Sequence, residues 1–150
     1  MIKKYLNEET IQLKQVAGDY REAIRKAAMP LITAGKIKDG YIEQMFAAME
    51  ELGPYMVILP GVALVHARPS DNVKEECMSL MTLLEPVEFG HKKNDPVDTV
   101  FVRASPNKDE HLDVLVSVSK LLLEDEFMAA LKQCSKVEEI IKYFKQEETQ

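Results

Sequence analysis

The chain has 150 residues, of which 46% are hydrophobic and 29% are charged, and this size and balance fit one globular domain spanning residues 1–150. A chain of this length buries about 70% of the surface that its unfolded form exposes, so it needs no covalent cross-links to fold. The formal net charge of −6 argues against nucleic acid as a partner, because nucleic-acid binding relies on a basic face. An acidic surface instead suits a basic protein partner.

The two cysteines and the N-terminus bear on the compartment. Cys77 and Cys134 are far apart in the sequence and neither has metal-ligand spacing around it, which favours a reducing compartment and a packing role. Lys3 and Lys4 are followed by acidic residues instead of the apolar core of a signal peptide. No apolar stretch reaches the length of a membrane span. The sequence therefore predicts a cytoplasmic protein that does not insert directly into a membrane.

Two helices are predicted in the first third of the chain, after a polar start to which no element is assigned. Apolar residues recur at helical spacing from Asp19 to Ala34, where Pro30 should kink the helix and Gly35 should end it. The second helix should begin at Asp39, a good N-cap, and stop before Gly53. Its predicted inward stripe is Ile42, Met45, Phe46, Met49 and Leu52.

Four segments in the middle of the chain read as strands: 55–59, 62–65, 77–84 and 99–104. The run from Cys77 to Leu84 is ambiguous between helix and strand, and its short length between turns favours a strand. Because helices and strands are interleaved without a repeat or a linker, the sequence predicts one layered α/β domain.

The last third of the chain reads as helical. Asn107 with Glu110, and Ser135 with Glu138, form two capping boxes, and a short helix should start at residues 124–126. In the helix after Asn107 the predicted core stripe is Leu112, Leu115, Val116, Leu122 and Leu123.

His66 is the candidate functional residue, because it ends the unbroken apolar run from Val62 to Val65. Arg68 follows two residues later, so in extended geometry both side chains point the same way. A neutral imidazole beside a guanidinium suits a transferable anion such as phosphate, with the ring nitrogen as nucleophile and the guanidinium on the phosphate oxygens. The local pattern by itself favours a histidine that only caps a strand by a backbone hydrogen bond.

The other two histidines differ in context. His91 sits in a polar loop and is assigned no role. His111 falls in the first turn of the predicted helix after Asn107, where unpaired backbone N–H groups favour an anion. A surface or capping role for His111 is the alternative. A metal site is not indicated, because no pair of histidines has zinc-ligand spacing.

Seven residues around His66 form a recognisable pattern: Glu51, Ile58, Val62, Ala63, Leu64, His66 and Ala67. This pattern resembles the active-site signature of the type 2 enzyme IIA of the bacterial sugar phosphotransferase system, the mannitol/fructose class. The segment from Gly53 to Pro69 is most similar to the ascorbate-type branch, and the likeness covers nearly the whole chain. Val65 stands where the commonest form of the signature has proline, and Leu59 where it has a small residue. Neither change removes a reacting group.

The resemblance implies a mannitol-type enzyme IIA fold, with a mixed sheet of about five strands and helices on both faces, one strand more than the pattern alone predicts. It further implies that His66 accepts a phosphoryl group from the phosphohistidine of HPr and passes it to the cysteine of a cognate enzyme IIB. The membrane component enzyme IIC would then take up a carbohydrate, with L-ascorbate as the branch-level expectation. No cofactor is implied. The segment from Asp109 to Leu115 resembles the family's second histidine, so His111 is expected to support the reaction without carrying the phosphoryl group.

One family feature is missing. Mannitol-type members carry an arginine about sixteen residues before the active histidine, and Glu50 stands there in this chain. Arg68 is the candidate replacement for that charge. A regulatory protein that docks on a transporter or a transcription regulator according to its phosphorylation state is the alternative function, because the same histidine would serve it. The oligomeric state does not follow from the sequence.

Overall fold

The computed structural model describes residues 2–107 and 112–148. Within these residues five strands form one mixed sheet in the order β1-β4-β5-β3-β2. The central strand β5 (Val97–Ala104) pairs antiparallel with β4 (Cys77–Val87) and parallel with β3 (Val62–Val65). The edge strands are β1 (Ile11–Gln15), parallel to β4, and β2 (Val57–Leu59), antiparallel to β3. The mixed five-stranded sheet of the expected fold is therefore confirmed.

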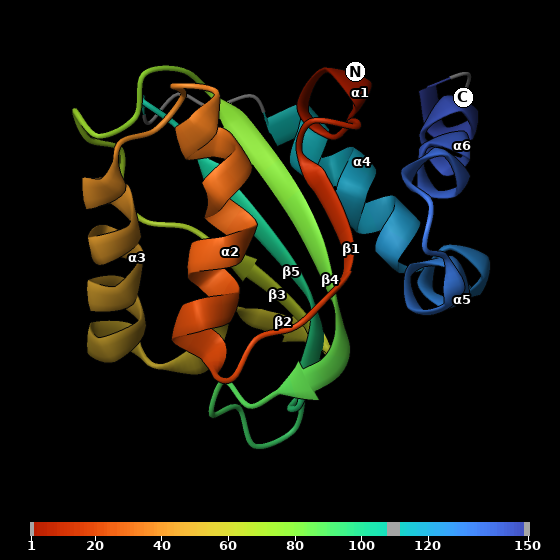
Figure 1. The fold of residues 1–150 in the computed structure, drawn as a ribbon, viewed down its shortest axis with the longest axis horizontal. Coiled ribbons are helices and arrows are strands. Elements are labelled where there is room, and N and C mark those ends of the chain that lie inside the picture. Colours follow the sequence, from red (N-terminus) through yellow and green to blue (C-terminus); the bar gives the residue numbers. More distant parts are fainter. Residues whose placement is uncertain (1, 108–111, 149–150) are drawn as a thin grey trace.

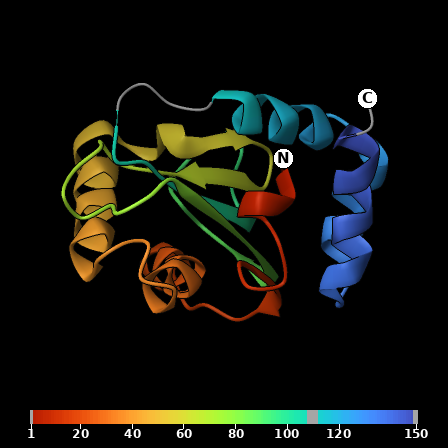
Figure 2. The ribbon, with the colours of Figure 1, turned by 90° about the horizontal axis from the view of Figure 1, so that it is seen from above.

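Helices cover both faces of the sheet (Figures 1 and 2). On one face α2 (Tyr20–Thr33) and α3 (Asp39–Leu52) share a hydrophobic core with alternate residues of the strands. The core on the other face is built by α1 (Ile2–Tyr5), α4 (Leu112–Leu122), α5 (Asp125–Gln133) and α6 (Val137–Glu148). This two-sided burial explains why the β3 segment reads as a continuous apolar run.

The two helices predicted in the first third of the chain are confirmed, with one wrong cap. The Asp19 carboxylate accepts a hydrogen bond from the backbone N–H of Glu22 at 2.8 Å and caps α2. In α3, however, Lys38 occupies the cap position without a side-chain hydrogen bond, and Asp39 is the first helical residue. An acidic residue in the first turn still interacts favourably with the helix dipole, which explains why the sequence resembles a cap there. Leu52, predicted inward, is 56% exposed.

Two elements were not predicted, and one predicted strand is shorter. The polar start contains α1 and β1, and β1 was missed because it is a short edge strand in which only Ile11 is fully buried. Its pairing with β4 decides its conformation. Of the predicted strand 55–59, only the last three residues form β2, because Pro54–Met56 form a 3-10 turn, η1.

The predicted core stripe of α4 is wrong in part. Val116 is 52% exposed and Leu123, just beyond the helix, is 77% exposed. Leu122 of the predicted stripe is buried, and the other buried residues of this segment are Val114, Val118 and Leu121. Nearly every turn of α4 carries Leu or Val, so periodicity could not select between its faces. The predicted Asn107–Glu110 capping box lies partly outside the described residues.

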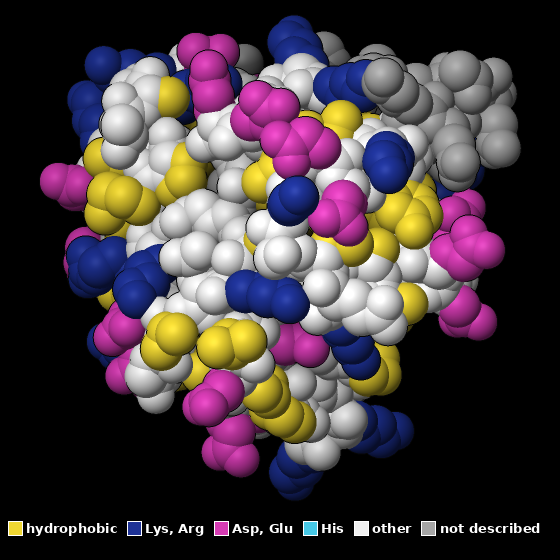
Figure 3. Space-filling model, turned by 45° about the vertical axis from the view of Figure 1, so that its right-hand side comes forward, with side chains coloured by type: hydrophobic (Ala, Val, Ile, Leu, Met, Phe, Trp, Pro, Cys, Tyr) yellow, Lys and Arg dark blue, Asp and Glu magenta, His cyan; other side chains and the backbone are white. Residues whose placement is uncertain are grey.

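The surface that carries α4, α5 and α6 comes forward in Figure 3. Hydrophobic side chains there are interspersed with charges of both signs. None of the helices in residues 2–107 and 112–148 is long and apolar enough to cross a membrane.

Candidate functional site

A cavity of about 520 Å³ opens at the carboxyl ends of the parallel strands β3 and β5. Its walls come from α3, from η1, from the segment that follows β3 and from the end of β5. Its lining includes Tyr41, Leu52, Tyr55, His66, Arg68 and Arg103. Ligands of open sheets that contain parallel strands commonly bind at this edge, because loops and helix ends meet there.

The half-buried His66 lies directly after β3, and the backbone of its own strand fixes its ring. Its Nδ1 lies 3.1 Å from the carbonyl oxygen of Leu64. A carbonyl oxygen only accepts, so Nδ1 must carry the proton that it donates, and Nε2 then bears the lone pair. The ring also meets Tyr55 edge-on, with centroids 6.1 Å apart and an interplanar angle of 84°. The histidine is thus held in the tautomer in which Nε2 is the nucleophile.

The environment of His66 favours the neutral ring. Burial lowers the pKa of His66 below its usual range, the hydrogen bond to Leu64 opposes this, and the positive charge of Arg103 lowers the pKa further. An imidazole with a lowered pKa is unprotonated on the reacting nitrogen at neutral pH. His66 therefore combines a free lone pair with access to the cavity, as a nucleophile requires.

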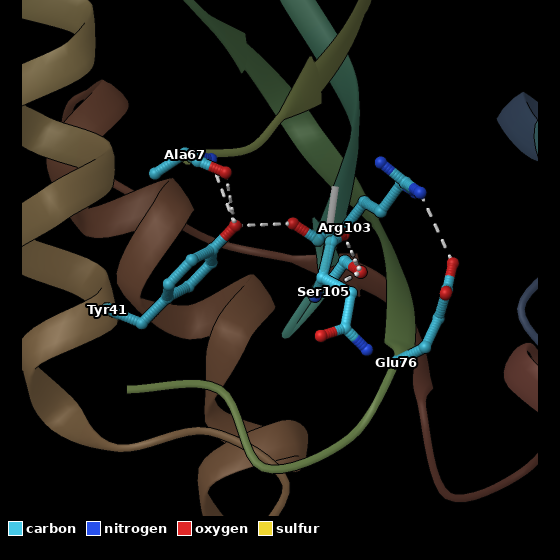
Figure 4. A network of polar contacts seen from close by, with 6 residues as sticks. Tyr41, Ala67, Glu76, Arg103 and Ser105 are labelled. Atoms are coloured by element: carbon cyan, nitrogen blue, oxygen red, sulfur yellow. Dashed lines mark hydrogen bonds and ion pairs between the residues drawn. The ribbon is translucent and has the colours of Figure 1, made fainter. Parts of the chain in front are cut away.

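Tyr41 of α3 ties together the two strand ends that form the site (Figure 4). Its hydroxyl accepts a hydrogen bond from the backbone N–H of Ala67 at 2.9 Å and donates to the carbonyl oxygen of Arg103 at 2.8 Å. Burial raises the pKa of Tyr41 to about 12, so the hydroxyl keeps its proton at neutral pH. Tyr41 is a positioning residue that sequence analysis missed, because its partners Ala67 and Arg103 are far from it in the sequence.

The other residues singled out in the sequence differ in where they lie relative to the cavity. Arg68 lines the same cavity as His66, and its side chain is exposed. His111 lies outside the described residues. Glu50, at the position of the family arginine, forms an ion pair with Arg21 of α2 and is not among the residues that line the cavity.

Arg103 is a second residue that sequence analysis missed. It lines the cavity, and its Nη2 lies 3.3 Å from the Glu76 carboxylate. Both side chains are largely buried, with 14% of Arg103 and 12% of Glu76 exposed. A signal was present in the sequence, since Arg103 follows the buried apolar run Val100–Val102 in the same way that His66 follows Val62–Val65.

The described part of the chain contains no group of three or more His, Cys, Asp and Glu residues placed to hold a metal ion. The groups assembled around the cavity are an imidazole, two guanidinium groups, hydroxyls, side-chain amides and the Glu51 carboxylate. This set suits the binding and transfer of an anionic group.

The comparisons with known proteins agree with this fold. The chain matches the family described as the phosphoenolpyruvate-dependent sugar phosphotransferase system, EIIA 2, over residues 4–147. It is 34% identical over 133 residues to the ascorbate-specific PTS system EIIA component of Salmonella choleraesuis, with 88% of this chain and 86% of the relative covered.

Two solved structures support the same relationship. A putative PTS IIA (PtxA) from Streptococcus mutans has a TM-score of 0.85 and 29% identity, with 99% of this chain and 93% of that chain covered. Enzyme IIAMTL from Escherichia coli, in its complex with phosphorylated enzyme IIBMTL, has a TM-score of 0.79 and 25% identity, with 91% of this chain and 94% of that chain covered. The protein is thus a phosphotransferase component of the enzyme IIA type. It belongs to the EIIA 2 family of the sugar phosphotransferase system, as the resemblance in its sequence predicted.

Proposed function

We propose that this protein is a phosphocarrier that accepts a phosphoryl group from phospho-HPr on Nε2 of His66 and passes it to the cysteine of a cognate enzyme IIB. The single observation that carries the proposal is the hydrogen bond between His66 Nδ1 and the Leu64 carbonyl beside an accessible cavity. It leaves the lone pair on the other nitrogen of a ring whose pKa is lowered.

The chemistry consists of two displacements at phosphorus. The Nε2 lone pair forms a bond to phosphorus while the N–P bond of phospho-HPr breaks, and the electron pair of that bond stays on the HPr ring. The proton stays on Nδ1 throughout, in its hydrogen bond to the Leu64 carbonyl. In the second displacement the enzyme IIB thiolate forms the S–P bond, and the pair of the Nε2–P bond returns to His66. Alignment and positive charge are the main contributions that the protein makes to such a transfer.

Partners must reach His66, and an apolar rim beside the cavity supports docking. Leu52, Tyr55 and Ile58 are 56%, 48% and 43% exposed, and the first two line the cavity itself. A small apolar contact of this kind suits transient exchange with two successive partners. The complex of E. coli enzyme IIAMTL with phosphorylated enzyme IIBMTL shows that a structural relative of 25% identity binds an enzyme IIB.

Arg68 and His111 complete the proposal as supporting residues. Arg68 lies on the cavity wall and brings a positive charge to it. The role of His111 rests on the family resemblance alone, and we propose that it hydrogen-bonds the phosphoryl group without carrying it.

The carbohydrate and the location belong to the same proposal. The similarity to ascorbate-specific EIIA components supports L-ascorbate as the carbohydrate taken up by the system. A relay between HPr and enzyme IIB, feeding a membrane enzyme IIC, would take place in the cytoplasm.

The test is reconstitution of the relay. The purified protein is incubated with enzyme I, HPr and phosphoenolpyruvate, and then with candidate enzyme IIB proteins. We expect one phosphoryl group on His66 that disappears when the cognate enzyme IIB is added. Labelling that no enzyme IIB removes would instead identify a regulatory protein, and no labelling would contradict the proposal altogether.

A further inference from the structure

A row of three polar residues crosses the carboxyl end of the sheet next to the cavity. The parallel register pairs Val65 with Val102, so its continuation by one residue places His66 beside Arg103. The antiparallel register pairs Arg103 with Met78, and Glu76 comes two residues before Met78. Neighbouring strands lie about 4.8 Å apart. Arg103 thus occupies the strand between the histidine and the glutamate.

All three side chains belong to the same face of the sheet. Leu64, Phe101 and Met78 contribute to the core beneath α4, α5 and α6, whereas Val65 and Val102 contribute to the opposite core. Because side chains alternate along a strand, His66, Arg103 and Glu76 share the face of Leu64, Phe101 and Met78. Two further observations agree that His66 and Arg103 lie close together. Both residues line one cavity, and the charge of Arg103 contributes to the lowered pKa of His66.

Arg103 is better placed than Arg68 to act on a group attached to His66. Its side chain is 14% exposed, its guanidinium is held by Glu76, and its backbone carbonyl is fixed by Tyr41 (Figure 4). A largely buried charge is screened less by solvent than an exposed one. Arg68 is exposed and follows the end of β3 in an irregular segment. A side chain fixed in advance also loses less entropy when its ligand arrives.

We propose that Arg103 is the cation that binds the phosphoryl group on His66, and that Glu76 positions its guanidinium for this. The proposal rests on the phosphocarrier function above and supplies the cation that Glu50 does not provide. A guanidinium carries five N–H donors in a planar fork, so it can contact a carboxylate and phosphoryl oxygens together. Arg103 exchanges no electrons or protons in the transfer. It stabilises negative charge on the equatorial oxygens while the N–P bonds break and form.

The first experiment measures phosphoryl transfer. Arg103→Met, Arg103→Lys and, as a matched control, Arg25→Met on the exposed surface of α2 are assayed in single turnover with phospho-HPr. We expect Arg103→Met to be about tenfold to a hundredfold slower, because a charge-assisted hydrogen bond to phosphate is lost. Arg103→Lys should recover part of the rate, since it keeps the charge without the fork. Arg25→Met should transfer at the wild-type rate.

The second experiment uses a readout that a purely structural ion pair would not change. Each protein is phosphorylated with phosphoramidate, a small donor that does not depend on docking to HPr, and the phosphoryl group is titrated by ³¹P NMR. Arg103 should hold the phosphoryl pKa below that of the Arg103→Met protein. If the wild type takes phosphate from phosphoramidate but not from phospho-HPr, the relay fails while the role of Arg103 can still be judged.

A third comparison tests Glu76. Glu76→Gln should slow transfer less than Arg103→Met, and adding it to Arg103→Met should change nothing more, because Glu76 acts through the guanidinium. If Arg103→Met does not fold, Arg103→Lys carries the test, with an intermediate rate and ³¹P titration expected. A folded Arg103 variant with the wild-type rate and the wild-type ³¹P titration would overturn the proposal.

Discussion

His66 directly follows β3, His91 belongs to the loop whose Asn94 contacts the residue before β3, and the two rings are held in opposite ways. Both His66 and His91 are half-buried, and both use Nδ1 to contact the backbone. Nδ1 of His66 donates to the Leu64 carbonyl. Nδ1 of His91 instead accepts from the backbone N–H groups of Lys93 and Asn94, at 3.2 and 3.0 Å.

The loop that His91 organises supports the start of β3. The Asn94 carbonyl accepts a hydrogen bond from the Gly61 N–H at 2.9 Å, and the Asn94 side chain donates to the Val57 carbonyl at 3.2 Å. The difference shows how the backbone assigns a role to a histidine. The Nδ1 lone pair of His91 accepts hydrogen bonds within its loop. The Nδ1 proton of His66 is donated to the backbone, so the Nε2 lone pair of His66 stays available in the cavity.

Removing the cavity histidine should give the largest effect. His66→Ala should accept no phosphoryl group, because no other described histidine combines the Nδ1–H tautomer with the cavity. The assay is labelling by phosphoenolpyruvate, enzyme I and HPr, with acid lability and alkali stability as marks of a phosphoramidate bond. Stoichiometric labelling of His66→Ala would sink the assignment.

The third histidine should give an intermediate effect. If His111 hydrogen-bonds the phosphoryl group, His111→Ala should slow single-turnover transfer about tenfold to a hundredfold without abolishing it. A wild-type rate would make His111 a bystander. Complete loss of phosphorylation would mean that the roles of His66 and His111 had been exchanged.

The pH dependence of phosphoryl transfer should distinguish His66 from a histidine of unperturbed pKa, with a smaller effect than the two substitutions above. A histidine of unperturbed pKa is half protonated at pH 6.5, which would halve the rate of attack. The pKa of His66 is lowered, so transfer from phosphoramidate at pH 6.5 should fall by less than about twofold relative to pH 7.5.

Stability should respond to pH with a defined sign. Between the lowered pKa of folded His66 and pH 6.5, the unfolded chain binds more protons at His66 than the folded chain does. The contribution of His66 to the free energy of unfolding therefore decreases as the pH falls through that window. His66→Ala should therefore lose less stability than the wild type between pH 7.5 and pH 5.5 in urea unfolding. An equal loss in both proteins would contradict the lowered pKa.

The loop histidine should affect stability alone. His91→Ala removes the acceptor of two backbone N–H groups and should cost about 1–2 kcal/mol of unfolding free energy, while phosphoryl transfer stays at the wild-type rate. His91→Asn is the matched variant, because the asparagine oxygen can accept from the N–H two residues on and restore part of the stability. Slower transfer in a stable His91→Asn protein would show that the two ends of β3 are coupled.

The sequence predicted the parts of the molecule that depend on local pattern. The buried run of β3, the helix α2 and the phosphoryl-accepting candidate His66 all follow from residues within a few positions of one another. The edge strand β1 and the buried face of α4 depend on what each packs against, and local periodicity did not reveal them.

The residues of the site divide in the same way, into those that local pattern indicates and those that contacts between distant residues bring together. Arg103 and Tyr41 reach His66 through strand register and through a hydrogen bond between α3 and β5, contacts between residues 25 or more positions apart. Arg68 was proposed from its spacing to His66, and the structure confirms only that both line one cavity.

The central claim is that Nε2 of His66 carries the phosphoryl group, and NMR of the phosphorylated protein with ¹⁵N-labelled histidine tests it most directly. The ¹⁵N and ³¹P spectra report which ring nitrogen is bonded to phosphorus. We expect a single phosphohistidine, His66, with phosphorus on Nε2 and the proton still on Nδ1 facing the Leu64 carbonyl. Phosphorus on Nδ1 of His66, or on His91 or His111, would contradict the account.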